Sequence, residues 1–134
     1  MNPKQLFVSI AVATLLLAIG CRKEAGSGGN CAIQGRLWVR DFNSTFTQLI
    51  AEYPGEDTYV YIVYGSHYGY DERIKTDYKG EFEFTALYPG EYTIYAYSAD
   101  STLTDPNNNV AVLREVTIEK RKEVVDLGNI VIYE

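Results

Sequence analysis

Histidine and cysteine, on which many catalytic and metal sites depend, are almost missing from this chain. Its 134 residues include one histidine, His67, and two cysteines, Cys21 and Cys31. A lone histidine without a second titratable partner at fixed spacing does not make a general acid–base site, and no cysteine or histidine cluster has the spacing of a zinc site. We therefore expect no enzymatic activity, no bound metal and no cofactor.

Positive charge is also scarce. The chain carries 12 Lys and Arg against 18 Asp and Glu, which gives a net charge of −6 with His67 neutral. An acidic surface repels phosphate backbones, and no basic patch interleaved with aromatic residues offsets this repulsion. Nucleic acid is therefore not expected as a partner.

One loop offers oxygen atoms that a hard cation could use, namely those of Asp100, Asp105, Asn107 and Asn109. The twelve-residue EF-hand pattern is absent, however, and loops rich in Asp and Asn are common. Pro106 followed by asparagines favours turns and positive φ angles. Residues 98–109 are thus expected to form a surface loop without a metal.

Helical periodicity is absent as well. After residue 31 no apolar spacing of i, i+3, i+4 and i+7 extends beyond two turns, whereas apolar and polar residues alternate along most of the chain. The positions assigned to the interior are Ile33, Leu37, Val39, Val60, Ile62, Tyr64, Phe82, Phe84, Tyr92, Ile94, Ala96, Val116, Ile118, Val125, Leu127, Ile130 and Ile132. This pattern predicts an all-β sandwich or barrel. Residues 41–52 fit it poorly and could be a loop, a strand or a short helix.

The N-terminal twenty residues contain one lysine and then an apolar run from Leu6 to Ile19. The run is too short to span a bilayer comfortably and has the layout of a signal peptide, assigned to residues 1–20. Residues 17–21, LAIGC, resemble the lipobox of bacterial lipoproteins, in which the cysteine is acylated and becomes the mature N-terminus. An ordinary signal peptide followed by a chance cysteine is the alternative.

Acylation of Cys21 would hold the protein on a membrane stably, because two or more acyl chains bind far more tightly than one. Residues 21–30, rich in glycine, predict a flexible tether of roughly 15–20 Å, and residues 31–134 the single domain. With Cys21 acylated, Cys31 would have no disulfide partner. It is expected to be a small, half-buried residue at the start of a strand rather than a reactive thiol.

Residues 76–92, TDYKGEFEFTALYPGEY, contain two turn signals around an alternating run. Asp77 can bond its own backbone two residues on, and Gly80 supplies a positive φ. Pro89 and Gly90 suit the second and third positions of a type II turn. The run between and after them assigns Phe82, Phe84, Leu87 and Tyr92 to the core.

This stretch is similar to the signature of carboxypeptidase regulatory-like domains, and residues 33–37 and 126–132 are similar to that family's first and last strands. The resemblance implies a transthyretin-like (prealbumin-like) sandwich, an antiparallel Greek key of seven to eight strands. It fails over residues 41–75, where this chain is longer and rich in tyrosine. Such domains occur as accessory parts of peptidases and outer-membrane receptors and as small lipoproteins of the Bacteroidetes type, which implies an accessory or binding role.

Tyrosine is the residue that stands out, with 12 in the chain. The residues expected to face outward or lie in the 65–71 loop are Trp38, Tyr59, Tyr61, Tyr68, Tyr70, Tyr95 and Tyr97. Exposed aromatic side chains in register across a sheet make a flat surface that suits sugar stacking or protein docking. The alternative is that these tyrosines simply suit half-buried strands, some of them covered by residues 41–52.

These observations predict a lipid-anchored protein of the cell envelope, on the outer membrane, acting as a non-catalytic binding or accessory module for a glycan or an envelope protein. The alternative is a structural subunit of a surface assembly or outer-membrane receptor complex, held by pairing of edge strands. An enzyme would need a second catalytic group brought close to His67 by the fold.

Overall fold

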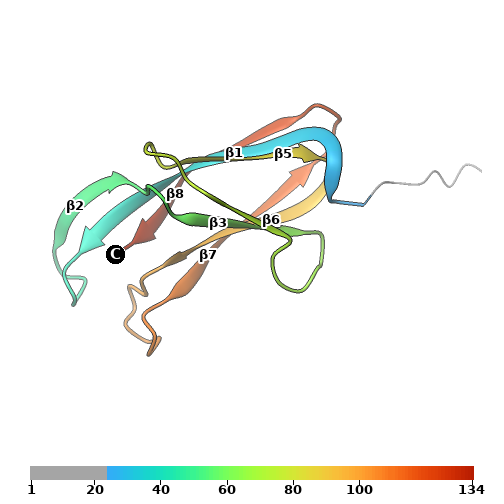
Figure 1. The fold of residues 1–134 in the computed structure, drawn as a ribbon. Helices are drawn as coiled ribbons and strands as arrows, with labels where there is room; N and C mark the ends of the chain where they lie inside the picture. Colours follow the sequence, from blue (N-terminus) through green and yellow to red (C-terminus); the bar gives the residue numbers. More distant parts are fainter. Residues whose placement is uncertain (1–23) are drawn as a thin grey trace, which may run out of the picture.

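The computed structural model describes residues 24–134, which form a β-sandwich without helices (Figure 1). The strands are β1 (Ser27–Phe42), β2 (Leu49–Pro54), β3 (Tyr59–Tyr64), β4 (Glu72–Lys75), β5 (Glu81–Leu87), β6 (Gly90–Ser98), β7 (Val110–Ile118) and β8 (Val124–Tyr133). The all-β, eight-stranded architecture confirms the predicted fold class. No helix in this range is long and apolar enough to cross a membrane.

The first sheet is organised around β1, which pairs with three other strands. β8 pairs with one edge of β1, while the other edge pairs first with β5 and then with β2. The β1–β8 pair is parallel, which differs from the expected all-antiparallel arrangement. The difference arises because the chain leaves β7 in the second sheet and crosses to the first before β8 begins. The second sheet is antiparallel throughout, in the order β4-β3-β6-β7.

The core lies between the two sheets and is built from the inward positions of the alternating strands. The most buried side chains include Ile33, Leu37, Val39, Val60, Ile62, Phe84, Leu87, Tyr92, Ile94, Ile118 and Ile130. Fully burying a side chain of this size contributes about 1.5–3 kcal/mol. The period of two therefore identified the core correctly. Cys31 is also part of the core, only 1% exposed, and its thiol donates to the carbonyl of Lys120, so the prediction that it is half-buried was wrong.

Gly35 interrupts the apolar face of β1 because the ring of Phe82 occupies the space a side chain would need. A Cβ atom at Gly35 would lie 2.7 Å from Cζ of Phe82. The two residues are directly opposite each other in the β1–β5 pair. The glycine is thus a packing requirement of this sheet.

The turn before β5 has the predicted chemistry. Oδ1 of Asp77 accepts hydrogen bonds from the backbone N–H groups of Lys79 and Glu81, each at 2.9 Å, and Gly80 has a φ of +78°. The turn before β6 differs, because Gly90 has a φ of +156° instead of the value near +80° that a type II turn requires. A Cβ atom at Gly90 would lie 2.8 Å from Cβ of Ala25, so this glycine makes room for the incoming N-terminal segment.

Residues 41–52 end β1 and begin β2, with a turn between them that Asn43 organises. Its side-chain oxygen accepts the N–H groups of Thr47 and Gln48. Because β2 pairs with β1 in the first sheet, this segment belongs to the opposite sheet from β3 and β6. It does not cover the tyrosines of those strands.

The first described residues are more ordered than a tether would be. β1 begins at Ser27, so residues 27–30, expected in the tether, lie in a strand. The N–H of Gly26 donates to the hydroxyl of Tyr92 at 2.9 Å, and Ala25 packs against the core. The signal peptide and Cys21 lie outside the described residues.

Candidate functional site

The outer face of the second sheet carries an aromatic surface, the tyrosine face, which we define as Tyr59, Tyr61, Tyr70, Tyr95 and Tyr97. Cross-strand pairing places Tyr61 of β3 opposite Tyr95 of β6, and Tyr95 opposite Leu113 of β7. On the other side, Tyr61 lies opposite Arg73 of β4. One row of outward side chains therefore crosses all four strands, from Arg73 through the two rings to Leu113.

The rings pack on one another. Tyr61 and Tyr95 stack with centroids 4.8 Å apart and planes at 6°, a separation that matches the spacing of neighbouring strands. Tyr97 contacts both rings edge-on, at 5.5 and 5.8 Å. Rings stacked at the strand spacing cover each other's faces and stand upright on the sheet. They present ring edges and hydroxyl groups to solvent.

Burial within this cluster affects ionisation. Desolvation, followed by the neighbouring hydroxyls of Tyr97 and Tyr61, raises the pKa of Tyr95. The Tyr95 hydroxyl therefore stays protonated and can donate a hydrogen bond over the whole physiological range. The face combines apolar ring edges with hydroxyl tips.

Two cations of β4 border the tyrosine face. The Arg73 guanidinium lies 4.2 Å from the ring centroid of Tyr59, and the Lys75 ammonium lies 5.1 Å from the same centroid. Such contacts attract the cations to the negative face of the ring. Arg73 also lies 6.0 Å from the ring centroid of Tyr70.

The 65–71 loop contributes one of its two tyrosines to the face. The ring of Tyr70 contacts Tyr61 edge-on at 5.0 Å and is 48% exposed. Tyr68 is fully exposed, and no ring contact joins it to the tyrosine face among the described residues. The structure thus brings together Tyr59, Tyr61, Tyr70, Tyr95 and Tyr97, and leaves Tyr68 apart.

His67 has a titratable neighbour, Asp71, which the sequence pattern did not predict. Its Nδ1 lies 2.8 Å from Oδ1 of Asp71, while Oδ2 of Asp71 accepts the backbone N–H of Tyr64 at 2.7 Å. Desolvation opposes ionisation of Asp71, but the bonds from Tyr64 and His67 outweigh it and lower its pKa. Within residues 24–134 no serine, threonine or cysteine side chain is hydrogen-bonded to His67. The pair bridges residues 67 and 71 of the loop that carries Tyr70.

Trp38 lies on the outer face of the first sheet, on the opposite side of the sandwich from the tyrosine face. Its Nε1 is 3.4 Å from Oε1 of Glu52, and the Arg36 guanidinium lies 4.9 Å from its ring centroid. The outward direction predicted for Trp38 agrees with this position. Sequence alternation alone did not show that it belongs to the other sheet.

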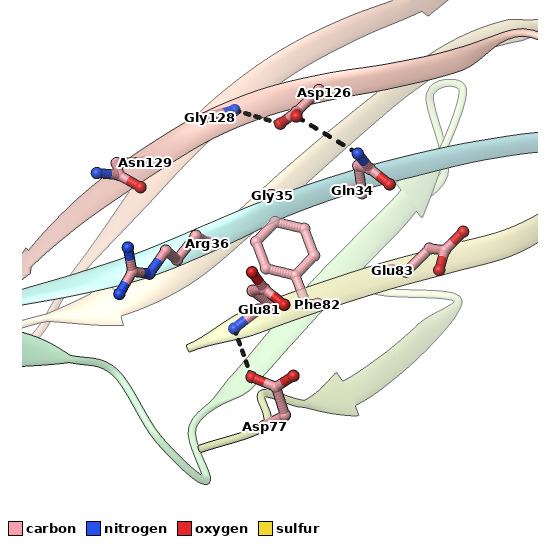
Figure 2. Close-up of a pocket in the computed structure, with 10 residues that line it drawn as sticks. All are labelled: Gln34, Gly35, Arg36, Asp77, Glu81, Phe82, Glu83, Asp126, Gly128 and Asn129. Carbon is pink, nitrogen blue, oxygen red and sulfur yellow. Dashed lines mark hydrogen bonds between the residues drawn. The ribbon is translucent and has the colours of Figure 1, made fainter. Parts of the chain in front are cut away.

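A polar depression of about 460 Å³ lies on the same outer face of the first sheet (Figure 2). Its lining includes the carboxylates of Asp77, Glu81, Glu83 and Asp126. Figure 2 shows that two of these carboxylates are used by local structure: Asp77 accepts the N–H of Glu81, and Asp126 accepts that of Gly128. Among residues 24–134 no group of three acidic, histidine or cysteine side chains is arranged to hold a metal ion. The depression is therefore an acidic surface feature shaped by turns.

The Asp- and Asn-rich loop likewise directs its oxygens inward. Asp100, only 4% exposed, accepts hydrogen bonds from backbone and side-chain groups of its own loop. Oδ1 of Asp105 accepts the N–H of Asn107 at 2.7 Å. These oxygens organise the loop between β6 and β7.

The sequence pattern did not predict that Arg73, Lys75 and Leu113 belong to this face. The sequence pattern of β4 is weak, because the strand is only four residues long and its sequence, ERIK, contains a single apolar residue. Its alternation does place Arg73 and Lys75 on one face. Only the pairing of β4 with β3 identifies that face as the one bearing the tyrosines.

Comparison with known proteins identifies a family to which this chain is similar. A family model described as the second beta sandwich domain of the NOMO1-like BOS complex subunit matches residues 59–126, which include the whole tyrosine face. No curated protein matches the chain.

Two solved structures are distantly similar. A Pseudomonas aeruginosa protein described as a candidate carbohydrate-binding protein shares 14% identity over 82% of this chain and 92% of its own, with a TM-score of 0.48. A 9R-lipoxygenase from Cyanothece shares 16% identity over 92% of this chain but only 20% of its own, with a TM-score of 0.36. These similarities are too distant to indicate a function.

Proposed function

This chain belongs to the family of NOMO1-like second β-sandwich domains, and from that premise we propose that it is a non-catalytic module that binds a partner protein through the tyrosine face. The observation that carries the proposal is the row Arg73–Tyr61–Tyr95–Leu113, in which outward side chains of four strands lie in register. Tyrosine and arginine are the residues most enriched at the centres of protein interfaces.

The orientation of the rings favours a protein over a glycan. Stacking on a sugar needs an aromatic face open to solvent, but Tyr61 and Tyr95 cover each other at 4.8 Å and Arg73 lies over Tyr59. Upright rings with hydroxyl tips suit a partner that offers apolar side chains and backbone hydrogen-bonding groups together. A glycan is the alternative outcome of the test below.

The chain also has the sequence features of an envelope lipoprotein, and we include acylation of Cys21 and attachment to the outer membrane in the proposal. The apolar run that ends at Cys21 supports this part. β1 begins at Ser27, so an anchor at Cys21 would hold the sandwich close to the membrane. The partner would then be another envelope protein.

A structural subunit of an envelope assembly is the second candidate. Within the described residues β7 ends its sheet and pairs only with β6, which leaves its outer edge unpaired, as is the outer edge of β4 at the other end. The family is named after a subunit of a complex, which supports a role in assembly. A partner present in equal amounts in complexes purified from intact membranes would favour this role over transient binding.

The test places a photo-cross-linking amino acid at Leu113, which is 57% exposed at the end of the row. The matched control is the same amino acid at Tyr78, which is 71% exposed in the turn before β5. We expect one protein to cross-link in host cells from position 113 and not from position 78. Tyr61→Ala together with Tyr95→Ala should lower the yield about tenfold or more, as loss of interface hot spots does.

Equal cross-linking from both positions, or a yield that the double substitution leaves unchanged, would refute the proposal. A glycan array probed with the full chain separates the remaining alternative. Glycan binding that disappears with Tyr61→Ala would show that the face recognises sugar instead of protein.

A further inference from the structure

The row across the tyrosine face is chemically uneven from one end to the other. At the β4 edge it begins with Arg73, beside Lys75, and at the β7 edge it ends with Leu113. The middle is occupied by the stacked rings of Tyr61 and Tyr95. A partner lying along the row would meet positive charge at one end and an apolar side chain at the other.

Acidic side chains neutralise the positive charges of Arg73 and Lys75 at the β4 edge only weakly. Arg73 is exposed and forms no ion pair within residues 24–134; its guanidinium lies over the ring of Tyr59 instead. Lys75 contacts Asp57 at 3.1 Å, but the Asp57 side chain is 74% exposed. An exposed pair of this kind contributes little to stability, so a ligand can displace it readily.

This cationic edge contrasts with the rest of the domain. Residues 24–134 contain nine Lys and Arg against eighteen Asp and Glu. On the tyrosine face itself the nearest acid on β7 is Glu115, two residues from Leu113 and opposite Thr93 of β6. The face therefore carries two cations at its β4 end, whereas at its β7 end Glu115 is accompanied by Arg114, whose guanidinium donates to the Leu113 carbonyl.

We propose that the tyrosine face recognises an acidic protein segment, whose carboxylates bind Arg73 and Lys75 and whose apolar side chain packs on Leu113. The inference rests on the proposed function and specifies the chemistry of the partner. Complementary charge of this kind governs orientation and association rate. Two cations at the β4 end, against one acid and one cation on β7, place the acidic end of the segment at β4.

The geometry also predicts how far apart the acidic and apolar residues of the partner lie. Arg73 and Leu113 are three strand positions apart in the row, a distance of roughly 14 Å at 4.7–4.9 Å per strand. An extended peptide advances about 3.3 Å per residue. The acidic residues of the partner should therefore lie about four positions from its apolar residue.

The test uses two fluorescent peptides and the full chain. One peptide is Ser-Glu-Glu-Ser-Thr-Ser-Leu-Val-Ser, and the other replaces both glutamates by lysine. We expect the glutamate peptide to bind and the lysine peptide not to bind in fluorescence anisotropy titrations. Arg73→Gln should weaken binding of the glutamate peptide about tenfold, as loss of a charged hydrogen bond does, and should flatten its dependence on salt.

Two variants serve as controls. Lys79→Gln removes a cation that also lies over a tyrosine, 5.6 Å from the ring of Tyr78, but away from the row, and should leave binding unchanged. Arg73→Lys keeps the charge and should retain the salt dependence. Circular dichroism of each variant shows that the sandwich is intact.

Equal binding of the two peptides, binding of neither, or indifference to Arg73→Gln would overturn the inference. Its failure can be told apart from failure of the proposed function. If cross-linking from position 113 persists and is lost with Tyr61→Ala and Tyr95→Ala, the face binds a protein and only the acidic chemistry is wrong.

Discussion

At the scale of single residues, Asp100 shows how one carboxylate can organise a loop. Its oxygens accept the backbone N–H groups of Thr102, Thr104 and Asp105 at 2.7–2.9 Å. Both threonine hydroxyls donate to it as well. These bonds, led by the one from the Thr102 hydroxyl, hold the pKa of Asp100 well below its usual range.

This shift makes the stability of the loop depend on pH. Because the pKa is lower in the folded state than in the unfolded one, the stabilisation is complete above about pH 5 and is lost as the pH falls through the folded-state value. We expect Asp100→Asn to lower the free energy of unfolding at pH 7, with the difference from wild type shrinking between about pH 5 and pH 2. Urea unfolding at a series of pH values measures it.

Asp126→Asn is the matched control, since Asp126 is an exposed carboxylate that accepts one turn N–H, from Gly128. Its effect on stability at pH 7 should be smaller. A difference between Asp100→Asn and wild type that stays constant down to pH 2 would contradict the assignment.

At the scale of elements, β1 holds the first sheet together because it pairs with β2, β5 and β8. The alternation of its apolar residues predicted most of this strand, but not its beginning. Residues 27–30 consist of small and polar residues, so no hydrophobic pattern marks them as strand. They join the sheet through backbone contacts to Leu87, opposite Ser27.

A chain that starts at Cys31, the predicted domain boundary, should therefore be less stable than one that starts at Glu24. It loses the bond from the Gly26 N–H to the Tyr92 hydroxyl and the bond from the Tyr88 N–H to the Gly26 carbonyl. At about 0.5–1.5 kcal/mol for each bond, the unfolding temperature should fall by several degrees. Differential scanning calorimetry of the two chains measures the change.

Tyr92→Phe in the longer chain is the control, because it removes one side-chain hydroxyl while keeping the strand. It should cost less than the truncation. Equal unfolding temperatures for the two chains would mean that residues 24–30 contribute nothing to the fold.

At the scale of the whole molecule, the sandwich separates two chemically different outer faces (Figure 1). The first sheet carries Trp38 and the acidic depression, and the second carries the tyrosine face with its cationic edge. A protein held on a membrane could use only the face that its anchor leaves accessible. The attachment point therefore matters to the proposed function.

Replacement of the proposed acylation site, Cys21→Ser, should release the protein from the membrane. A single serine carries no acyl chain, and each lost methylene removes about 0.8 kcal/mol of membrane binding. We expect the wild-type chain to incorporate labelled palmitate and to sediment with membranes, and the variant to do neither. Cys31→Ser is the control, since that thiol is buried in the core; labelling of the Cys21→Ser chain would disprove the anchor.

The sequence by itself determined the strands of the core, the turn at Asp77 and Gly80, and the outward direction of Tyr59, Tyr61, Tyr95 and Tyr97. These are local properties, because side-chain direction follows from the period of a strand and turn type from two or three residues. Only the tertiary structure decided which strands are neighbours. It stacked Tyr61 on Tyr95, placed Arg73 beside them, put Trp38 on the other sheet and buried Cys31. Such pairings join residues far apart in the chain, and no local pattern encodes them.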